Sequence, residues 1–188
     1  MADIARDLGV KIKLNEEVEE LIIEGKKVVG ARTSKCTYTA DRFVMNVDFA
    51  VGMKGLVSNE VRKKWSDEKL EEKSYSCSTF MLYLGMDKLY DAPHHQIYAA
   101  KDYENNLKDI VENKVTWDDP SIYVQNASVT DPSLAPDGHS TLYVLVPVSN
   151  THPSIKWDSI KHKFRDVIVK QMALLGFDDV EEHIMSET

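Results

Sequence analysis

The chain has 188 residues, 43% of them hydrophobic, and a formal net charge of −8. This length and hydrophobic content are enough to bury a core, either in one large domain or in one domain with a smaller unit beside it. The excess of acidic residues argues against nucleic acid as a partner, because proteins that bind it present clustered basic residues to the phosphates.

The cysteines and the hydropathy pattern favour a cytoplasmic protein. Cys36 and Cys77 are far apart and form no C-x-x-C pair, so reduced thiols are the simpler expectation. No stretch approaches the ~18–20 apolar residues of a transmembrane helix. The charged start of the chain, with Asp3, Arg6 and Asp7, is unlike a signal peptide. We therefore expect a protein that is at most peripheral to a membrane.

A helix and a strand are expected first. Residues 1–8 place apolar side chains on one helical face, and Gly9 follows as a helix stop. In residues 10–14, Val, Ile and Leu alternate with lysine, which predicts a half-buried strand.

A β-meander and a further strand are expected next. Residues 18–23 and 26–33 flank Gly25, which can take the positive φ of a tight hairpin turn. A third strand is predicted at residues 36–40. The apolar centre of residues 41–47 predicts another buried strand.

The central stretch of the chain is Ser74–Gly85, with residues 142–148 as its predicted partner strand. Both are rich in β-branched, aromatic and aliphatic residues. Alternate residues of the first stretch form two uncharged sets, Phe80, Leu82 and Leu84 on one side and Thr79, Met81 and Tyr83 on the other. We therefore expect an interior strand that is covered on both faces.

The remaining elements complete an α+β fold with a mixed sheet flanked by helices. The patterns predict helices at 61–65, 69–73, 103–111 and 157–175, and strands at 94–100 and 121–126. We expect a first domain over residues 1–48 and a second over residues 49–188.

Few motifs for chemistry are present. There is no G-x-G-x-x-G, P-loop, G-x-S-x-G or zinc-ligand spacing, so no catalytic residue and no metal site are assigned. The most conspicuous pair is His94-His95. Adjacent residues on a strand point to opposite faces, so we do not expect the two to bind one metal ion. A purely structural role is the simpler interpretation.

An ordered set of segments resembles a known family. Residues 8–48, which include L-G-V-K-I-K-L-N-E-E-V-E-E-L-I-I-E-G-K-K-V-V-G-A-R and A-D-R-F-V-M-N-V-D, are similar to the FAD-binding part of carotenoid desaturases of the phytoene dehydrogenase type. Segments S-C-S-T-F-M-L-Y-L-G, A-P-H-H-Q-I-Y, D-D-P-S-I-Y-V, T-D-P-S-L-A-P-D-G and L-Y-V-L-V-P-V follow in that family's order. The serine-rich start of the central strand is closer to the diapophytoene branch.

The sequence also departs from the family pattern. The family begins with a glycine-rich fingerprint for the FAD pyrophosphate and ends with a second glycine-containing flavin segment, and neither is present here. The resemblance therefore implies an internal fragment with part of the FAD-binding domain (1–48) and the substrate-binding domain (49–188). We expect this fragment to be inactive alone and not to retain FAD.

The resemblance implies contacts for the cofactor. In the family, the strand at the position of Val18 passes the adenine, so Glu17 and Val18 are candidate adenine contacts. The segment Asn46, Val47 and Asp48 ends where the family's chain approaches the flavin. Val18 could equally be a core residue, and Asn46 and Asp48 could equally make local turn hydrogen bonds.

The resemblance also implies the substrate and the reaction. A long isoprenoid hydrocarbon would lose a hydride equivalent to FAD and a proton from the neighbouring carbon. Phe80, Leu82 and Tyr83, with residues 142–146, could line an apolar tunnel, although the same residues would serve as core. His94 and His95 match a segment on the family's substrate side, and neither is given a proton-transfer role.

Two other functions remain open. The chain could come from another flavin amine-oxidase-like enzyme, such as an isoprenoid saturase or isomerase, or it could be a non-catalytic module that binds hydrophobic ligands. A substrate that resides in the bilayer would also require a peripheral membrane contact. The apolar, glycine-containing Phe49–Val57 is the candidate for that contact, and its alternative interpretation is a buried connector.

Overall fold

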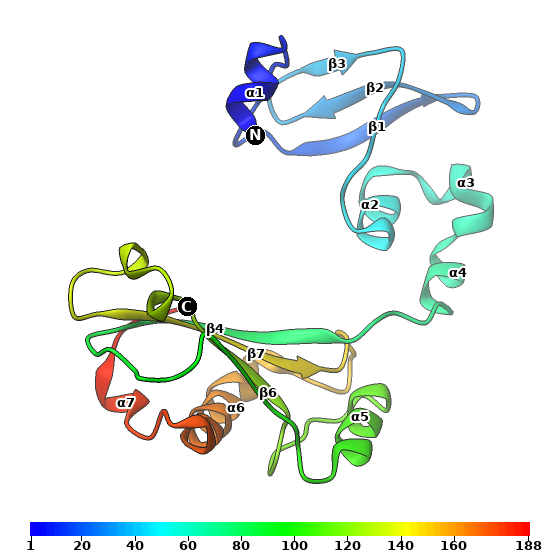
Figure 1. Ribbon diagram of the computed structural model, residues 1–188. Coiled ribbons are helices and arrows are strands. Elements are labelled where there is room, and N and C mark those ends of the chain that lie inside the picture. Colours follow the sequence, from blue (N-terminus) through cyan, green and yellow to red (C-terminus); the bar gives the residue numbers. More distant parts are fainter. The chain divides into compact units, whose positions relative to one another are not determined.

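The computed structural model describes all 188 residues, which form two compact units, residues 1–74 and residues 75–188 (Figure 1). The mixed α and β class is confirmed, but the sheet expected to be mixed is not, because every strand pairing in both units is antiparallel.

The first unit begins with a short helix and a three-stranded sheet of order β1-β2-β3. Gly25, with φ 64°, makes the turn between the first two strands, so the predicted hairpin is confirmed. These elements are α1 (Ala2–Asp7), β1 (Val18–Glu24), β2 (Lys27–Thr33) and β3 (Thr37–Thr39).

Two predicted strands of the first unit are wrong. Residues 10–14 and 41–47 form no strand, because neither pairs with a neighbour that would satisfy its backbone N–H and C=O groups. Their apolar side chains are largely exposed, and Val44 is 94% accessible. The alternation in residues 10–14 is therefore not the sign of a half-buried strand.

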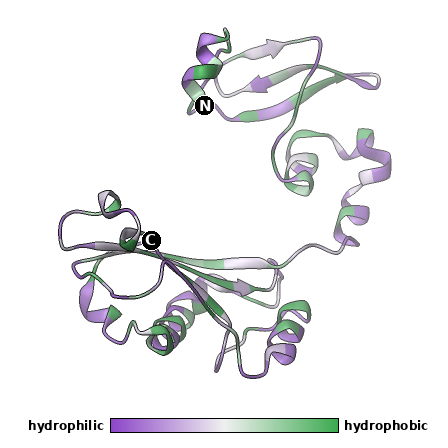
Figure 2. Cartoon of the chain, in the orientation of Figure 1, coloured by the Kyte–Doolittle hydropathy of each residue, from purple (hydrophilic) through white to green (hydrophobic).

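The rest of the first unit is helical, as expected for residues 61–65 and 69–73. Ser66 begins the last helix, and its hydroxyl accepts a hydrogen bond from the Lys69 N–H at 3.4 Å. The segment from α3 to α4 is mostly hydrophilic in Figure 2. These elements are α2 (Phe49–Leu56), α3 (Asn59–Arg62), η1 (Lys63–Trp65) and α4 (Asp67–Glu71).

The boundary between the units falls after Ser74, whereas the sequence suggested a boundary after residue 48. The reason is that α2 contacts β1, so this helix belongs to the first unit and does not open the second.

The second unit is built on a five-stranded sheet of order β5-β6-β7-β4-β8. The predicted partnership of its two long strands is confirmed, since β4 and β7 pair from Ser78 with Val148 to Met86 with Ser140. The strands are β4 (Ser78–Met86), β5 (His95–Tyr98), β6 (Ile122–Asn126), β7 (Ser140–Val148) and β8 (Ile184–Glu187).

The longest helices of the second unit, α5 and α6, lie on one side of this sheet (Figure 1). The stripe predicted for the long helix is confirmed, because Phe164, Ile168 and Met172 of α6 are fully buried in the core. Gly176, with φ 87°, ends the helical segment in the left-handed conformation. The helices are α5 (Tyr103–Val111), η2 (Ala127–Val129), η3 (Pro132–Leu134), α6 (Trp157–Met172), η4 (Ala173–Leu175) and α7 (Val180–His183).

The last strand, β8, approaches β4 at a glycine. A Cβ atom on Gly85 would lie 2.5 Å from the Ser186 hydroxyl, so a side chain there would force that hydroxyl to move. The turn before β8 is also tied to the end of β4, because Asp179 accepts hydrogen bonds from Lys88 and from the Tyr90 hydroxyl. The Lys88 ammonium lowers the pKa of the Asp179 carboxyl.

The expectation that the central strand is covered on both faces is wrong. On β4 the side chains of Leu82, Leu84 and Met86 are buried, whereas Tyr83 on the opposite face is 53% exposed. β7 shows the same alternation of fully and partly buried residues along its whole length. We call the side of this sheet opposite α6 the open face.

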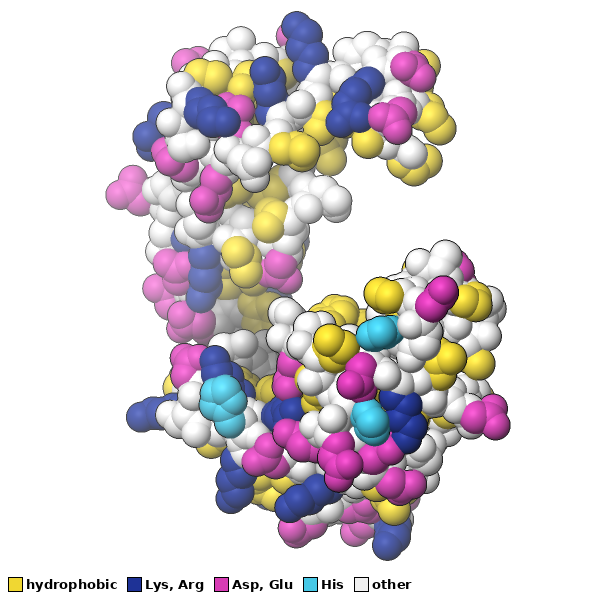
Figure 3. Space-filling model, turned by 90° about the vertical axis from the view of Figure 1, so that its left-hand side faces the viewer, with side chains coloured by type: hydrophobic (Ala, Val, Ile, Leu, Met, Phe, Trp, Pro, Cys, Tyr) yellow, Lys and Arg dark blue, Asp and Glu magenta, His cyan; other side chains and the backbone are white.

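The surface in the view of Figure 3 shows acidic and basic side chains interspersed, without a continuous basic patch. No helix combines the length and the apolar composition that crossing a bilayer requires. Cys36 and Cys77 are both free and exposed.

Candidate functional site

Side chains without charge form two rows across the open face of the second unit. Strand pairing places residues of four neighbouring strands, β5, β6, β7 and β4, side by side in each row. The polar-tipped row consists of His95, Gln125, Tyr143 and Tyr83. The apolar row consists of Ile97, Tyr123, Leu145 and Met81.

The aromatic rings of these rows contact one another. The Tyr83 and Tyr143 ring centroids lie 5.4 Å apart, and those of Tyr143 and Tyr123 lie 6.0 Å apart. Both pairs are edge-to-face, a geometry that adds ~0.5–1.5 kcal/mol to the burial of each pair. No hydrogen bond is formed by the Tyr83 or Tyr143 hydroxyl. The open face thus presents connected rings with free hydroxyl groups.

The histidine pair is arranged differently from the prediction. The rings of His94 and His95 stack with centroids 4.2 Å apart instead of pointing to opposite faces. The reason is that β5 begins at His95, so His94 precedes the strand and does not follow its alternation. Strand geometry therefore gives no ground for separating the two rings.

Each histidine is held by neighbouring side chains of the second unit. His94 accepts a hydrogen bond from the Gln125 amide at Nε2 (3.0 Å), so its Nδ1 carries the proton that it donates to the Thr130 hydroxyl (2.7 Å). His95 Nδ1 lies 2.7 Å from the Tyr123 hydroxyl. The two polar rings are therefore held in fixed positions at the β5 edge of the open face.

Of the predicted substrate contacts on β4, only Tyr83 lies on the open face. Phe80 packs under α6, with its ring centroid 5.2 Å from that of Phe164, and Leu82 is 4% exposed within the core. Phe80 and Leu82 are thus core residues, because the two-residue period of a strand sends them to the face opposite Tyr83.

A pocket of about 530 Å³ in the first unit brings together most of the residues predicted to contact the cofactor. It lies between the start of β1, the segment before α2, and α2 itself. Glu17, Val18, Asn46 and Val47 all contribute to its walls. The remaining wall residues are Glu19, Val44, Met45, Val51, Gly52, Gly55 and Leu56.

Asp48 is placed beside this pocket as the N-cap of α2. Its carboxylate accepts a hydrogen bond from the Val51 N–H at 3.0 Å, which satisfies one of the free donors at the helix start. The open alternative that Asp48 makes a local hydrogen bond is therefore what the structure shows. Asp48 positions α2 as one wall of the pocket.

Gly52 allows α2 to approach the segment before it. A Cβ atom at this position would lie 2.5 Å from Val47 Cγ1 and 2.9 Å from Met45 Sδ. The opposite wall is β1, which is the outer strand of its sheet, so one backbone edge of β1 is free of strand partners. The pocket therefore combines apolar side chains with an unpaired backbone edge.

This pocket also contains much of the segment considered for a membrane contact. Residues 49–56 form α2, and Val51, Gly52, Gly55 and Leu56 of that helix line the pocket. Phe49 is 47% exposed and packs against the Trp65 ring at 4.9 Å.

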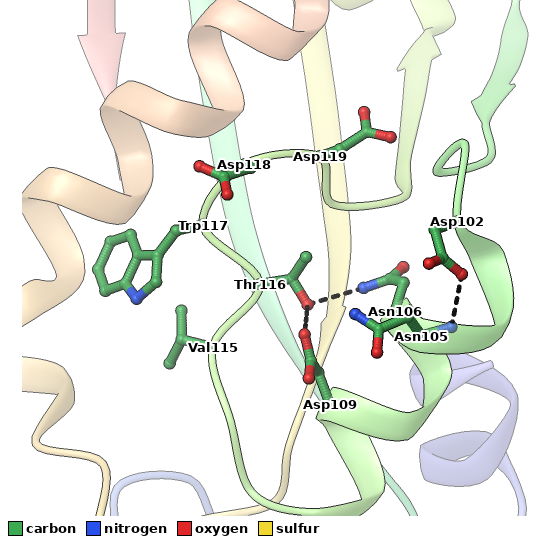
Figure 4. Close-up of a pocket in the computed structure, with 9 residues that line it drawn as sticks. All are labelled: Asp102, Asn105, Asn106, Asp109, Val115, Thr116, Trp117, Asp118 and Asp119. Carbon is green, nitrogen blue, oxygen red and sulfur yellow. Dashed lines mark hydrogen bonds between the residues drawn. The ribbon is translucent and has the colours of Figure 1, made fainter.

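A second pocket, of about 330 Å³, lies between α5 and the loop that follows it (Figure 4). Several of its polar groups are hydrogen-bonded to one another: Thr116 accepts from Asn106 and donates to Asp109, and Asp102 accepts from the Asn105 N–H. The pocket therefore joins α5 to its loop by internal hydrogen bonds. The chain has no group of three or more histidine, cysteine or acidic residues that could hold a metal ion.

Several open-face residues were not singled out from the sequence. Gln125, Ile97 and Tyr123 lie on strands whose neighbours could not be known, so nothing in the sequence placed them on the same face as Tyr83. The available signal was the alternation in residues 121–126 and 140–148, where aliphatic residues alternate with Tyr, Gln and Thr. This pattern is typical of strands with one open face.

Comparison with solved structures first identifies the fold. No protein-family profile matches the chain. A solved structure of an oxidoreductase from Methanosarcina mazei matches the whole chain and 39% of its own chain, with a TM-score of 0.59 and 16% sequence identity. The fold is therefore one that occurs in an oxidoreductase.

Closer relatives then identify the group of enzymes. Over its full length the chain is 45% identical to a 4,4'-diapophytoene desaturase (4,4'-diapolycopene-forming) of a Methylomonas species and 39% identical to the all-trans-zeta-carotene desaturase of Myxococcus xanthus. It is 33% identical to a 4,4'-diapophytoene desaturase (4,4'-diaponeurosporene-forming) of Staphylococcus aureus. The chain is thus homologous from end to end to carotenoid desaturases, which confirms the resemblance. It spans 37%, 36% and 39% of the lengths of these three relatives.

Proposed function

We propose that this chain forms the substrate-binding sheet and part of the FAD-binding region of a carotenoid desaturase that acts on a long isoprenoid hydrocarbon. The observation that carries this proposal is the open face, where eight uncharged side chains from four strands form a continuous surface. Homology along the whole chain to desaturases of this substrate class supports it.

The pocket of the first unit fits one portion of FAD. Its volume of about 530 Å³ lies within the usual ~300–1,000 Å³ of small-molecule sites. Val18, Val47 and Leu56 offer apolar contacts to a planar ring, and the free edge of β1 near Glu17 offers backbone groups. Asn46 adds an amide. We assign the adenosine portion to this pocket.

FAD, when bound, supplies the acceptor for the hydride equivalent that leaves the hydrocarbon. The chain's own contribution is to hold the hydrocarbon and to keep water away from it. The two rows carry no carboxylate, ammonium or guanidinium group, so an apolar chain can lie on them without desolvating a charge. His95, held by the Tyr123 hydroxyl, is the member of the polar-tipped row on β5.

A chimeric enzyme tests the proposal. This chain would replace the matching segment of the Methylomonas desaturase, to which it is 45% identical. We expect the chimera to bind FAD and to desaturate diapophytoene. A Leu145→Glu change in the apolar row should abolish the product while flavin content is kept, and Thr79→Glu, outside both rows, should leave turnover nearly unchanged.

Product analysis separates the alternatives. A chimera that saturates or isomerises the isoprenoid would favour the other flavin enzymes, and one that binds the hydrocarbon without turnover would favour a binding module. We further propose that the parent enzyme collects its substrate through peripheral contact with the bilayer, for which the exposed apolar side chains of α2 are the candidates in this chain.

A further inference from the structure

The two rows on the open face run across the strands and not along them. Neighbouring strands in a sheet lie ~4.8 Å apart, so a row over four strands is ~15 Å long. Along one strand, residues of the same face recur every ~6.7 Å. The open face therefore has two different repeats in two perpendicular directions.

An isoprenoid chain has a repeat of its own. Each unit adds four chain carbons and one methyl branch, which gives about 5 Å per unit when the chain is extended, close to the ~4.8 Å between strands. A chain laid across the strands would meet one side chain of a row per isoprene unit. A chain laid along a strand would drift out of step with the side chains.

The chemistry of the face also favours the crosswise direction. Along β4 the open face changes from Met81 and Tyr83 to Thr79 at one end and Gly85 at the other. Along β7 it ends in Thr141, whose hydroxyl lies 3.3 Å from that of Ser128. The apolar row, in contrast, is apolar or aromatic on all four strands.

We propose that a linear isoprenoid hydrocarbon binds across β5, β6, β7 and β4 over the apolar row, with one isoprene unit on each strand. This inference rests on the proposed function, which it deepens by assigning an orientation and a specificity-determining row. Ile97 and Met81 are then the ends of the row. The polar-tipped row runs beside it, and the hydrogen bond between His95 and Tyr123 links the two rows and fixes the Tyr123 ring.

A matched pair of variants of the full 188-residue chain tests the orientation. Ile97 is 76% exposed at the β5 end of the apolar row, and Thr79 is exposed on β4 beyond it, so both sites accept arginine without loss of core packing. Binding of lycopene in detergent solution would be followed by quenching of tyrosine and tryptophan fluorescence. Melting curves would verify that both variants are folded.

The crosswise orientation predicts that Ile97→Arg weakens lycopene binding about tenfold, because the hydrocarbon would have to cover a charge, and that Thr79→Arg changes it less than about twofold. The opposite result would overturn the orientation and leave the proposed function standing. Equal effects at the two sites would also overturn it. Failure of the unaltered chain to bind lycopene would contradict the proposed function itself, and this inference with it.

A straight-chain alkane provides the test of the methyl repeat. Squalene, which carries the isoprenoid branches, should compete with lycopene more effectively than an unbranched alkane of equal chain length. Equal competition by the two hydrocarbons would show that the strand spacing does not select for methyl branches, and it would overturn the assignment of one isoprene unit to each strand.

Discussion

The two units of this chain differ in how much apolar surface they bury. Of the fully buried hydrophobic residues, all except Leu70 lie in the second unit. There, α6 and the covered face of the sheet share one continuous core around Phe164. In the first unit the three-stranded sheet is only partly covered, by α2 at β1, and Val10, Val44 and Val51 are more than half exposed. The second unit thus has a continuous hydrophobic core of its own, whereas the first unit has none.

The difference separates the unit that supplies stability from the unit that holds the candidate cofactor pocket. Burial of apolar surface is the main favourable term in folding, at roughly 25 cal/mol per Å², and only the second unit has it in quantity. The exposed apolar residues of the first unit gather in part around the pocket assigned to the cofactor, at Val44, Val47 and Val51. A ligand in that pocket would supply burial that the unit itself does not have.

Separating the units is the strongest test of the comparison. We expect residues 75–188 to melt cooperatively when expressed alone, and residues 1–74 to show no cooperative transition, because the smaller piece buries too little apolar surface. Circular dichroism against temperature would measure both. A sharp transition for residues 1–74 would show that the comparison is mistaken.

Within the second unit, the covered and open faces should respond very differently to truncation. Phe164 is 1% exposed and contacts Phe80, Trp157 and Trp117, so Phe164→Ala should lower the free energy of unfolding by about 3–5 kcal/mol. Phe80→Ala should cost about 3 kcal/mol, because its ring is only partly buried. Tyr83→Ala on the open face serves as the control and should cost less than about 1 kcal/mol. Urea melts of the three variants would decide, and a large loss for Tyr83→Ala would refute an open face.

Much of the second unit could be predicted from the sequence because its elements have strong local patterns. The stripe of the long helix and the uncharged alternation of β4 and β7 gave the correct elements and the correct strand pair. The strands predicted at residues 10–14 and 41–47 failed because alternation reports a preference for extended backbone, whereas a strand also needs a partner. The open face was missed because a strand without charge does not reveal whether its second face is covered.

The candidate site was predictable in part. Glu17, Val18, Asn46 and Val47 were named from the family resemblance, and the structure brings them into one pocket although two of them are distant in sequence from the others. Gly52, by contrast, could not be chosen, since its importance depends on Val47 lying within the reach of a missing Cβ. Such close approaches are properties of packing and leave no mark on local sequence.

Alanine substitutions at the two glycines of α2 test how closely this helix packs in the first unit. Gly52→Ala should destabilise this unit by about 1–3 kcal/mol, because Val47 is β-branched and cannot easily move away from the new Cβ. Gly55→Ala has no atom within 4 Å of its Cβ and should instead stabilise the helix by about 0.5–1 kcal/mol. Amide hydrogen exchange of α2 in the full chain would measure both. Equal protection in the two variants would argue against close packing at Gly52.

A carboxylate of the second unit should make that unit sensitive to acid. The Lys101 N–H, the Gln171 amide and the Tyr98 hydroxyl bind Asp119 and hold its pKa below the ordinary value of 3.8. The stabilisation is therefore complete above that value and is lost as the pH falls through the lower pKa of the folded state. Asp119→Asn should cost about 1–2 kcal/mol at neutral pH and progressively less in acid.

Asp118→Asn is the matched control, because Asp118 is adjacent and exposed. Thermal melts from neutral pH to below the ordinary pKa of aspartate would compare the two variants. An acid dependence that is the same in Asp119→Asn and in the unaltered chain would show that another group is responsible.

The smallest expected effect concerns the bilayer. If α2 makes the peripheral contact, a double change of Met53→Glu and Leu56→Glu should reduce co-sedimentation of the chain with anionic liposomes, because a chain with a net charge of −8 has no net electrostatic attraction to replace the lost apolar contact. The melting of the second unit should not change. If the double change also removes protection of α2 from hydrogen exchange, these residues are needed for folding, and the contact must be sought elsewhere.

The aromatic cluster around Phe164 makes the second unit its own optical reporter. Trp117 and Trp157 both meet the Phe164 ring, at centroid distances of 5.9 and 5.6 Å, whereas Trp65 belongs to the first unit and lies against Phe49. Two of the three tryptophan side chains therefore lie in the same ordered, asymmetric environment. Near-ultraviolet circular dichroism should record the ordering of the second unit, and replacing Trp65 by phenylalanine would leave a spectrum that reports on that unit alone.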